Sequence, residues 1–408
     1  MQNARVNSKK VLFISGSVGL GHAARDLEIV KALRKLEPNV EVSWLAEDPA
    51  SRVLVRAGEN LLPEARLLAH SNAILDNIAK AYSVNMIRWV AKMREGWSSN
   101  VRIIAEVIKR GKFDLVVGDE TYDLIVELGR NPAYKNFPFV IIYDFIGLDC
   151  FSWHPMDKLV TYAANRSWAK ALEAESPLID KTLFIGVLED VLDKPFGFGL
   201  PNRREVAAKS VDFVGYVLPF EPGDFQDKMD IRKTLGYGDE PLIVCSIGGT
   251  SVGKSLLELC VKTYPLLKRT LGALRMVLVC GPLLKPDTIH TPAEVEVRGY
   301  VPELYKHFAA ADLCIISGGG TTTLELTALK RPFLYFPIKQ HFEQEVYIPD
   351  RCQRLRAGVK MNFSATTPEL LAEAALTNLG KQADFASIQT NGANKAAFLI
   401  DQVLNKNS

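Results

Sequence analysis

A glycine-rich segment near the N-terminus carries polar side chains whose types suit acid–base chemistry. Gly16, Gly19 and Gly21 follow an apolar run and lead to His22 and Arg25. Glycines allow a ligand to approach the backbone closely, and a neutral imidazole can take a proton from a hydroxyl group near physiological pH. We therefore predict that Gly19 and Gly21 line an acceptor or phosphate loop and that His22 is a general base. A dinucleotide-type turn with an incidental histidine is the alternative, although its usual spacing, G-x-G-x-x-G, differs from the spacing here.

Asp119 is the predicted partner of His22. It follows the apolar run Leu115 to Val117, so we expect it at the carboxyl end of a parallel strand, on the same rim as His22. A carboxylate there can fix the imidazole tautomer and stabilise the imidazolium that forms. Glu120 and Asp123 are alternative partners, and a helix N-cap is the alternative role for Asp119 itself.

A second glycine-rich segment suits anion binding. Gly318 to Gly320 follow the apolar run Leu313 to Ile316 and precede Thr321 and Thr322. Consecutive amides at a helix N-terminus, together with the helix dipole, make a diphosphate site. Glu325 lies one helical turn further on, where its carboxylate can accept hydrogen bonds from two vicinal ribose hydroxyls.

The two segments together resemble the MurG-like and UDP-glycosyltransferase families of GT-B glycosyltransferases. The resemblance rests on the loop Gly19 to His22 and on Gly319, Gly320, Thr323, Glu325, Pro337 and Gln344. It implies an inverting transfer of a sugar from a nucleotide-sugar, by default a UDP-sugar, to the hydroxyl of a small-molecule or lipid acceptor. It implies His22 as base with Asp119 as partner, and neither an essential metal ion nor another cofactor.

The resemblance also implies which residues hold the donor. Tyr300 and Val301 face the base, Glu325 the ribose, and Glu343 or Gln344 the transferred sugar. The diphosphate lies between two loops made of Gly249, Thr250 and Ser251 on one side and Gly318, Gly319, Gly320, Thr321 and Thr322 on the other. Two departures leave the sugar and nucleotide open, because small-molecule glycosyltransferases usually carry His-Cys-Gly where this chain has Ser317-Gly318-Gly319, and Asp-Gln where it has Glu343-Gln344.

Two other functions remain as alternatives. Nucleotide-sugar hydrolases and epimerases share the GT-B fold, and the form of Gly19 to Arg25 resembles a UDP-sugar hydrolase of the pseudaminic acid pathway. From another class, Gly248 to Ser255 matches the pattern of a P-loop NTPase. That function also needs an acid at the end of a nearby apolar strand, and the runs Met276 to Cys280 and Leu313 to Ile316 end without one.

The elements that must position these residues alternate between short β-branched runs and helical patterns. This pattern predicts an α/β protein with two Rossmann-like doubly wound domains facing across a cleft. The turn-rich segment after Tyr216 divides the chain into an acceptor-binding domain, residues 1–215, and a donor-binding domain, residues 216–408. We expect the last helix, Ala393 to Leu404, to pack back on the first domain.

Composition limits the partners. The 49 basic residues balance 47 acidic ones, so no overall positive electrostatic field favours binding to nucleic acid. Six scattered cysteines without metal-ligand spacing indicate buried free thiols and a cytoplasmic protein. The stretch Met86 to Lys112 interleaves basic and aromatic residues, which indicates peripheral contact with an anionic membrane, the alternative being ordinary helices with solvated faces.

Overall fold

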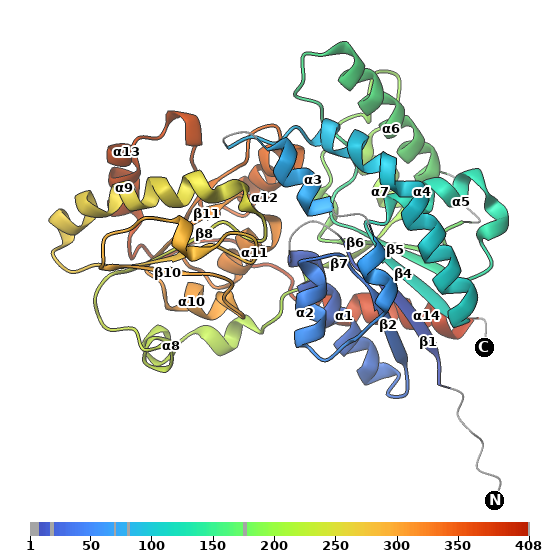
Figure 1. Ribbon diagram of the computed structural model, residues 1–408, viewed down its shortest axis with the longest axis horizontal. Helices are drawn as coiled ribbons and strands as arrows, with labels where there is room; N and C mark the ends of the chain where they lie inside the picture. The colour runs from blue at the N-terminus through green and yellow to red at the C-terminus, as the bar shows by residue number, and fades with distance from the viewer. Residues whose placement is uncertain (1–7, 17–19, 69–70, 80–81, 174–177, 407–408) are drawn as a thin grey trace, which may run out of the picture.

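The computed structural model describes residues 8–16, 20–68, 71–79, 82–173 and 178–406, and it contains two parallel β-sheets joined side by side (Figure 1). The first sheet has the strand order β3-β2-β1-β4-β5-β6-β7. Its strands are β1 (Lys10–Ile14), β2 (Glu41–Leu45), β3 (Asn60–Leu61), β4 (Leu115–Asp119), β5 (Phe139–Tyr143), β6 (Lys181–Ile185) and β7 (Asp212–Gly215). The order reverses between β1 and β4, which is where ligands bind in open α/β sheets.

The second sheet repeats this arrangement with the order β10-β9-β8-β11-β12-β13. Its strands are β8 (Leu242–Ser246), β9 (Arg275–Val279), β10 (Val295–Arg298), β11 (Leu313–Ser317), β12 (Phe333–Phe336) and β13 (Val359–Lys360). Here the order reverses between β8 and β11. The central strands are buried along their whole length, which explains their continuous apolar sequence.

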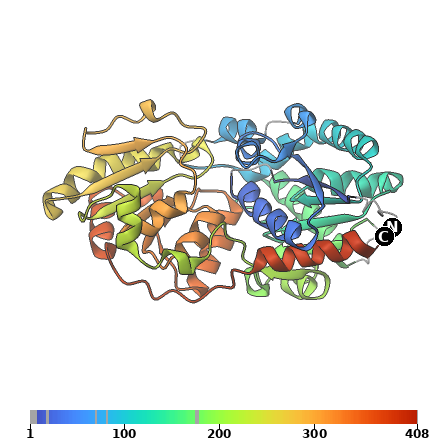
Figure 2. The ribbon, with the colours of Figure 1, turned by 90° about the horizontal axis from the view of Figure 1, so that it is seen from below.

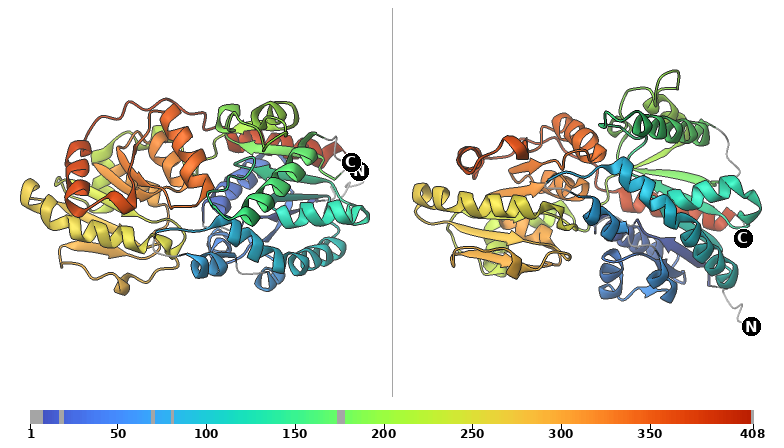
Figure 3. Two further views of the ribbon diagram at one scale, coloured as in Figure 1. Left: turned by 90° about the horizontal axis from the view of Figure 1, so that it is seen from above. Right: turned by 45° about the horizontal axis from the view of Figure 1, so that its top comes forward.

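Helices cover both faces of each sheet, as the views from above and from a tilted direction show (Figure 3). Around the first sheet lie α1 (Gly21–Leu36), α2 (Ala50–Arg56), α3 (Ser71–Ile78), α4 (Met86–Gly111), α5 (Tyr122–Arg130), α6 (Pro155–Glu173) and α7 (Arg203–Ser210). Around the second lie α8 (Lys228–Leu235), α9 (Lys254–Leu271), α10 (Leu304–Ala310), α11 (Gly320–Ala328), α12 (Ile348–Arg354) and α13 (Pro368–Asn378). The expected α/β class with two doubly wound sheets is thus confirmed.

The last helix, α14 (Gly392–Lys406), returns to the first sheet and lies beside α1 (Figure 2). Ala396, Ala397 and Ile400 of α14 are buried in one core with Ala23 and Val30 of α1. The chain therefore passes between the two sheets twice.

The cysteines and the helices bear on two expectations from the sequence. All six cysteines are free, and every one except Cys150 is buried. Among the described helices, none combines the length and the apolar character that a bilayer-spanning segment needs.

Candidate active site

His22 and Asp119 meet at the switch point of the first sheet. His22 is the second residue of α1, which follows β1, and Asp119 is the last residue of the neighbouring strand β4. Asp119 Oδ2 lies 2.7 Å from His22 Nδ1, and the Asp119 side chain is completely buried. Of the predicted loop glycines, Gly21 begins α1, whereas Gly19 lies outside the described residues.

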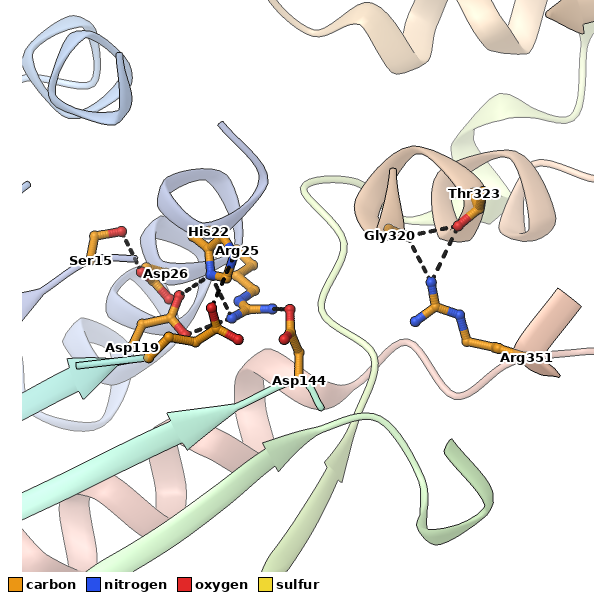
Figure 4. Close-up of polar contacts among 10 residues, drawn as sticks. Ser15, His22, Arg25, Asp26, Asp119, Asp144, Gly320, Thr323 and Arg351 are labelled. Carbon is orange, nitrogen blue, oxygen red and sulfur yellow. Dashed lines mark hydrogen bonds and ion pairs between the residues drawn. The ribbon is translucent and has the colours of Figure 1, made fainter. Parts of the chain in front are cut away.

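Arg25 joins this pair, and it was not among the predicted site residues. It lies three positions after His22 on α1, so both side chains are on one helix face. Its Nη2 donates to Asp119 Oδ1 at 2.6 Å and its Nη1 donates to Asp144 Oδ2 at 2.6 Å (Figure 4). Asp144 directly follows β5, so the carboxyl ends of three neighbouring strands contribute to one cluster. The position of Asp144 after an apolar run was the signal that could have identified it.

The contacts of Nδ1 decide which imidazole nitrogen can act as a base. Nδ1 lies 2.7 Å from the Asp119 carboxylate and 2.8 Å from Arg25 Nη2. When Nδ1 carries the hydrogen and donates it to Asp119, Nε2 keeps a free lone pair. Burial lowers the pKa of His22 and the Arg25 charge lowers it further, but the Asp119 and Asp144 carboxylates outweigh both, so the net pKa lies above 6.5.

The carboxyl groups around His22 differ in their protonation. Burial and the Asp119 charge raise the pKa of Asp26 well above its usual range, and Asp26 accepts a hydrogen bond from Ser15 at 2.6 Å. Burial opposes ionisation of Asp119, but the Arg25 charge and His22 hold its pKa below the usual range. Asp119 is therefore the ionised partner that His22 needs.

The wall opposite His22 is the N-terminal end of α11. Gly319 is the N-cap, with no side-chain cap, and Gly320 is the first helical residue. The first amides of a helix have no acceptor within it, so those of Gly320, Thr321 and Thr322 are available to an anion. Thr323 differs because its hydroxyl donates to the Gly319 and Gly320 carbonyls.

Arg351 of α12 adds a positive charge beside this helix end. Its Nη2 donates to the Gly320 carbonyl at 2.9 Å and to Thr323 Oγ1 at 3.2 Å, as Figure 4 shows. Sequence reasoning missed Arg351 because it lies 28 positions beyond Thr323, on a different helix.

Glu343 and Gln344 lie next to α11 but differ in role. Both belong to a single turn of π-helix, Glu343–Tyr347. Gln344 Oε1 accepts a hydrogen bond from the Ile338 amide at 3.0 Å, so this oxygen supports the loop after β12. Burial and the Asp144 charge raise the pKa of Glu343 to about 7. A Cβ built on Gly320 would lie 3.0 Å from Glu343 Oε1, so the Glu343 carboxyl group lies at the N-terminal end of α11.

The remaining predicted donor residues lie along the same edge of the second sheet. Gly249, Thr250 and Ser251 follow β8, which is the neighbour of β11. Tyr300 and Val301 follow the outermost strand, β10, and Arg56 of α2 lies 5.1 Å from the centre of the Tyr300 ring. Burial raises the pKa of Glu325, on α11, to about 8.

The two glycine-rich segments are in direct contact. A Cβ built on Gly21 would lie 2.2 Å from Thr321 Oγ1, far closer than such atoms approach one another. The N-terminal ends of α1 and α11 therefore face each other, and Gly21 allows this close approach.

Substituting Gly21→Ala should weaken the closed arrangement of the two sheets. The new methyl group must displace Thr321, and overpacking of this kind costs about 1–3 kcal/mol. We expect small-angle X-ray scattering to give a larger radius of gyration for the variant. Adding Thr321→Ala removes Oγ1 and should restore compactness, whereas Thr321→Ser keeps Oγ and should not. An unchanged radius for Gly21→Ala alone would mean that the contact does not hold the sheets together.

The lysine of the P-loop pattern is Lys254. It is the first residue of α9 and pairs with Glu258 on the same helix at 3.7 Å.

The stretch Met86 to Lys112 contains α4 and has a buried and an exposed side. Met86, Met93 and Ile104 point into the core, while Lys92 and Arg102 are exposed. Core packing accounts for this apolar pattern, and membrane contact through α4 stays a prediction.

Comparison with known proteins extends the geometric evidence. Residues 243–402 match the model of the glycosyltransferase family 28 C-terminal domain. Over 165 residues, 40% of this chain and 46% of the relative, the chain is 24% identical to an uncharacterized glycosyltransferase of Methanopyrus kandleri. Over 131 residues, 29% of this chain and 35% of the relative, it is 29% identical to the UDP-N-acetylglucosamine–N-acetylmuramyl-(pentapeptide) pyrophosphoryl-undecaprenol N-acetylglucosamine transferase of Desulforudis audaxviator. The chain thus spans less than half the length of these curated relatives.

The fold likeness covers almost the whole chain. The crystal structure of MurG from Acinetobacter baumannii matches 97% of this chain and 99% of that chain, with a TM-score of 0.50 and 16% identity. The two doubly wound sheets and this match define a GT-B fold. The match to the family model covers residues 243–402, the second sheet and most of α14, and the likeness to MurG concerns the fold.

Proposed function

We propose that this protein is an inverting glycosyltransferase that moves a sugar from a nucleoside diphosphate sugar, with UDP as the default nucleotide, to an acceptor hydroxyl. The observation that carries the proposal is the His22–Asp119 pair, which faces the N-terminal end of α11 across the contact of Gly21 with Thr321. A base and a diphosphate site on opposite walls are the two parts that such a transfer needs.

In the proposed reaction, the acceptor hydroxyl gives its proton to His22 Nε2 as its oxygen attacks the anomeric carbon. The bond from this carbon to the diphosphate oxygen breaks, and the electron pair leaves with the nucleoside diphosphate. Attack from the side opposite the leaving group inverts the configuration. The amides of Gly320 to Thr322 meet the charge that develops on the diphosphate.

The charges near α11 support a transfer that does not depend on a metal ion. Arg351 is held beside the helix end by the Gly320 carbonyl. A guanidinium group and a helix N-terminus together can stabilise a leaving diphosphate, the task that a divalent cation performs in other phosphate sites.

Ligand-dependent thermal stability tests the proposed donor site. We expect UDP to raise the Tm of the protein without added Mg²⁺, because a ligand at one hundred times its Kd stabilises the folded state by about 2.7 kcal/mol. The matched panel is dTDP, GDP and ATP, each with and without Mg²⁺. Incubation with UDP-N-acetylglucosamine then tests turnover through the release of UDP. A shift with ATP and Mg²⁺ alone would contradict the proposal and favour the P-loop alternative around Lys254.

A further inference from the structure

Glu120 has a backbone conformation that its side chain does not favour. Its φ is 53°, in the left-handed region that glycine and asparagine adopt more readily than glutamate does. Two hydrogen bonds hold the backbone of Glu120 in this conformation. The Glu120 amide donates to the Ile142 carbonyl at 3.0 Å, and the Glu120 carbonyl accepts from the Tyr122 amide at 2.8 Å. Strain of this kind tends to persist where function requires it.

The side chain of Glu120 is also incompletely satisfied. Its Oε1 is buried without a hydrogen-bond partner among the described residues, a condition that is rare in folded proteins. Its Oε2 lies 3.8 Å from His22 Nε2, the nitrogen opposite the Asp119 contact. A strained backbone and an unsatisfied carboxyl oxygen thus occur together, on the side of the imidazole that an acceptor must reach.

The Asp144 carboxylate favours the neutral form of Glu120. Carboxyl oxygens of the two residues lie within 4.8 Å of each other, and burial together with the Asp144 charge raises the pKa of Glu120 well above its usual range. Asp144 stays ionised because Arg25 Nη1 donates to it at 2.6 Å. The other titratable or charged groups facing this pair are His22 on α1, Asp119 at the end of β4, Tyr122 at the start of α5, Tyr143 at the end of β5 and Glu343 of the second sheet's π-helical turn.

We propose that Glu120 binds the attacking hydroxyl of the acceptor, holding it between its own carboxyl group and His22 Nε2, and that it does so by donating a hydrogen bond to the hydroxyl oxygen. This inference rests on the proposed glycosyltransferase function. The hydroxyl proton passes to His22, the new bond forms at the anomeric carbon, and the proton of Glu120 stays in place. The hydroxyl donates its one hydrogen to His22 Nε2. The O–H of neutral Glu120 therefore donates to the hydroxyl oxygen, which keeps a lone pair for the attack.

A divalent cation is the competing occupant of this position. His22, Glu120 and Asp144 offer ligand atoms that all lie within 4.8 Å of one another. The Arg25 guanidinium already neutralises Asp144, and a protonated Glu120 has no charge to offer a cation. The charges around this position therefore favour a hydroxyl over a metal ion.

Two substitutions separate a functional role of Glu120 from a structural one. Glu120→Gly removes the carboxyl group and relieves the unfavourable φ, so we expect its Tm to equal or exceed that of the wild type. The same variant should release UDP from UDP-N-acetylglucosamine about 100-fold more slowly, the effect of a misplaced reactant. Glu120→Gln keeps a neutral group whose amide N–H can still donate to the hydroxyl oxygen, so its rate should stay within about tenfold of the wild type.

The pH profile provides a readout that a structural role would not change. Wild-type kcat/KM should fall on the alkaline side as Glu120 ionises, because the neutral form is the active one. In Glu120→Gln this alkaline limb should be absent, since an amide does not titrate. An alkaline limb that persists unchanged would overturn the inference.

His22→Ala distinguishes failure of this inference from failure of the proposed function. If His22→Ala abolishes UDP release while Glu120→Gly does not reduce it, only the role of Glu120 is wrong. If His22→Ala is as active as the wild type, His22 is not the base, and if the wild type itself releases no UDP, the proposed function fails. The Tm measurement needs no turnover, and a lower Tm for Glu120→Gly would make Glu120 a structural residue. Activity that needs Mg²⁺ or Mn²⁺ and is lost in Glu120→Gln would identify a metal site instead.

Discussion

Replacing His22 by alanine should reduce sugar transfer by about 10²- to 10⁴-fold, the contribution typical of a positioned general base. The imidazole lies 2.7 Å from Asp119 Oδ2 through Nδ1 and 3.8 Å from Glu120 Oε2 through Nε2. UDP affinity should stay close to the wild-type value, because the proposed diphosphate site lies on α11. Measuring kcat and the UDP dissociation constant separately checks both parts of this prediction.

The pH dependence of kcat/KM should also identify His22 as the base. A base must be neutral, so kcat/KM should rise with pH through the pKa of His22, which lies above 6.5. In Asp119→Asn this acid limb should move to lower pH, because the carboxylate that raises the pKa of His22 is gone, and the plateau should fall as well. A His22→Ala enzyme that transfers sugar at the wild-type rate is incompatible with His22 as the base.

Replacing Glu325 by alanine should weaken donor binding by about 10- to 150-fold, the loss expected for a hydrogen bond to a charged group. The predicted partners of its carboxylate are the two ribose hydroxyls of the nucleotide. Burial raises the pKa of Glu325 to about 8, so the free protein near neutral pH holds this group mostly as the neutral acid. Only the ionised form accepts hydrogen bonds with both oxygens.

UDP affinity should therefore increase as the pH rises through about 8, the pKa of Glu325 in the free protein. Glu325→Gln should remove this pH dependence while keeping the size and shape of the side chain. Calorimetric titration of UDP into both proteins between neutral and alkaline pH tests the prediction. Equal affinity of the alanine variant and the wild type would mean that the ribose binds elsewhere, for instance nearer Tyr300.

The sequence predicted the parts of the fold that local pattern determines. Continuous apolar runs identified the buried strands around both switch points, including β1 and β11. Strand β6, Lys181–Ile185, which has three apolar residues at its end, was missed. The two-residue strands β3 and β13 carry no periodic signal at all.

The candidate site, like the fold, could be predicted only in part from the sequence. His22 and Asp119 could be paired because His22 follows β1 and Asp119 ends the neighbouring strand β4, and parallel neighbours bring their carboxyl ends together. Arg25 and Asp144 escaped because a buried ion pair between α1 and β5 depends on which strands are neighbours. The contact between Gly21 and Thr321 depends on how the two sheets face each other, about 300 residues apart in sequence, and no local pattern encodes it.

The return of α14 to the first sheet makes the two halves of this molecule inseparable by a single cut. A fragment that ends near Gly215 would leave the apolar side of α1, with Ala23 and Val30, without the cover that Ala396 and Ile400 supply. Two covalent connections also restrict relative movement more than one does, favouring a hinge-like opening over free rotation. Shortening the chain from its C-terminal end would thus disturb the half that carries His22, although that histidine lies near the other end of the sequence.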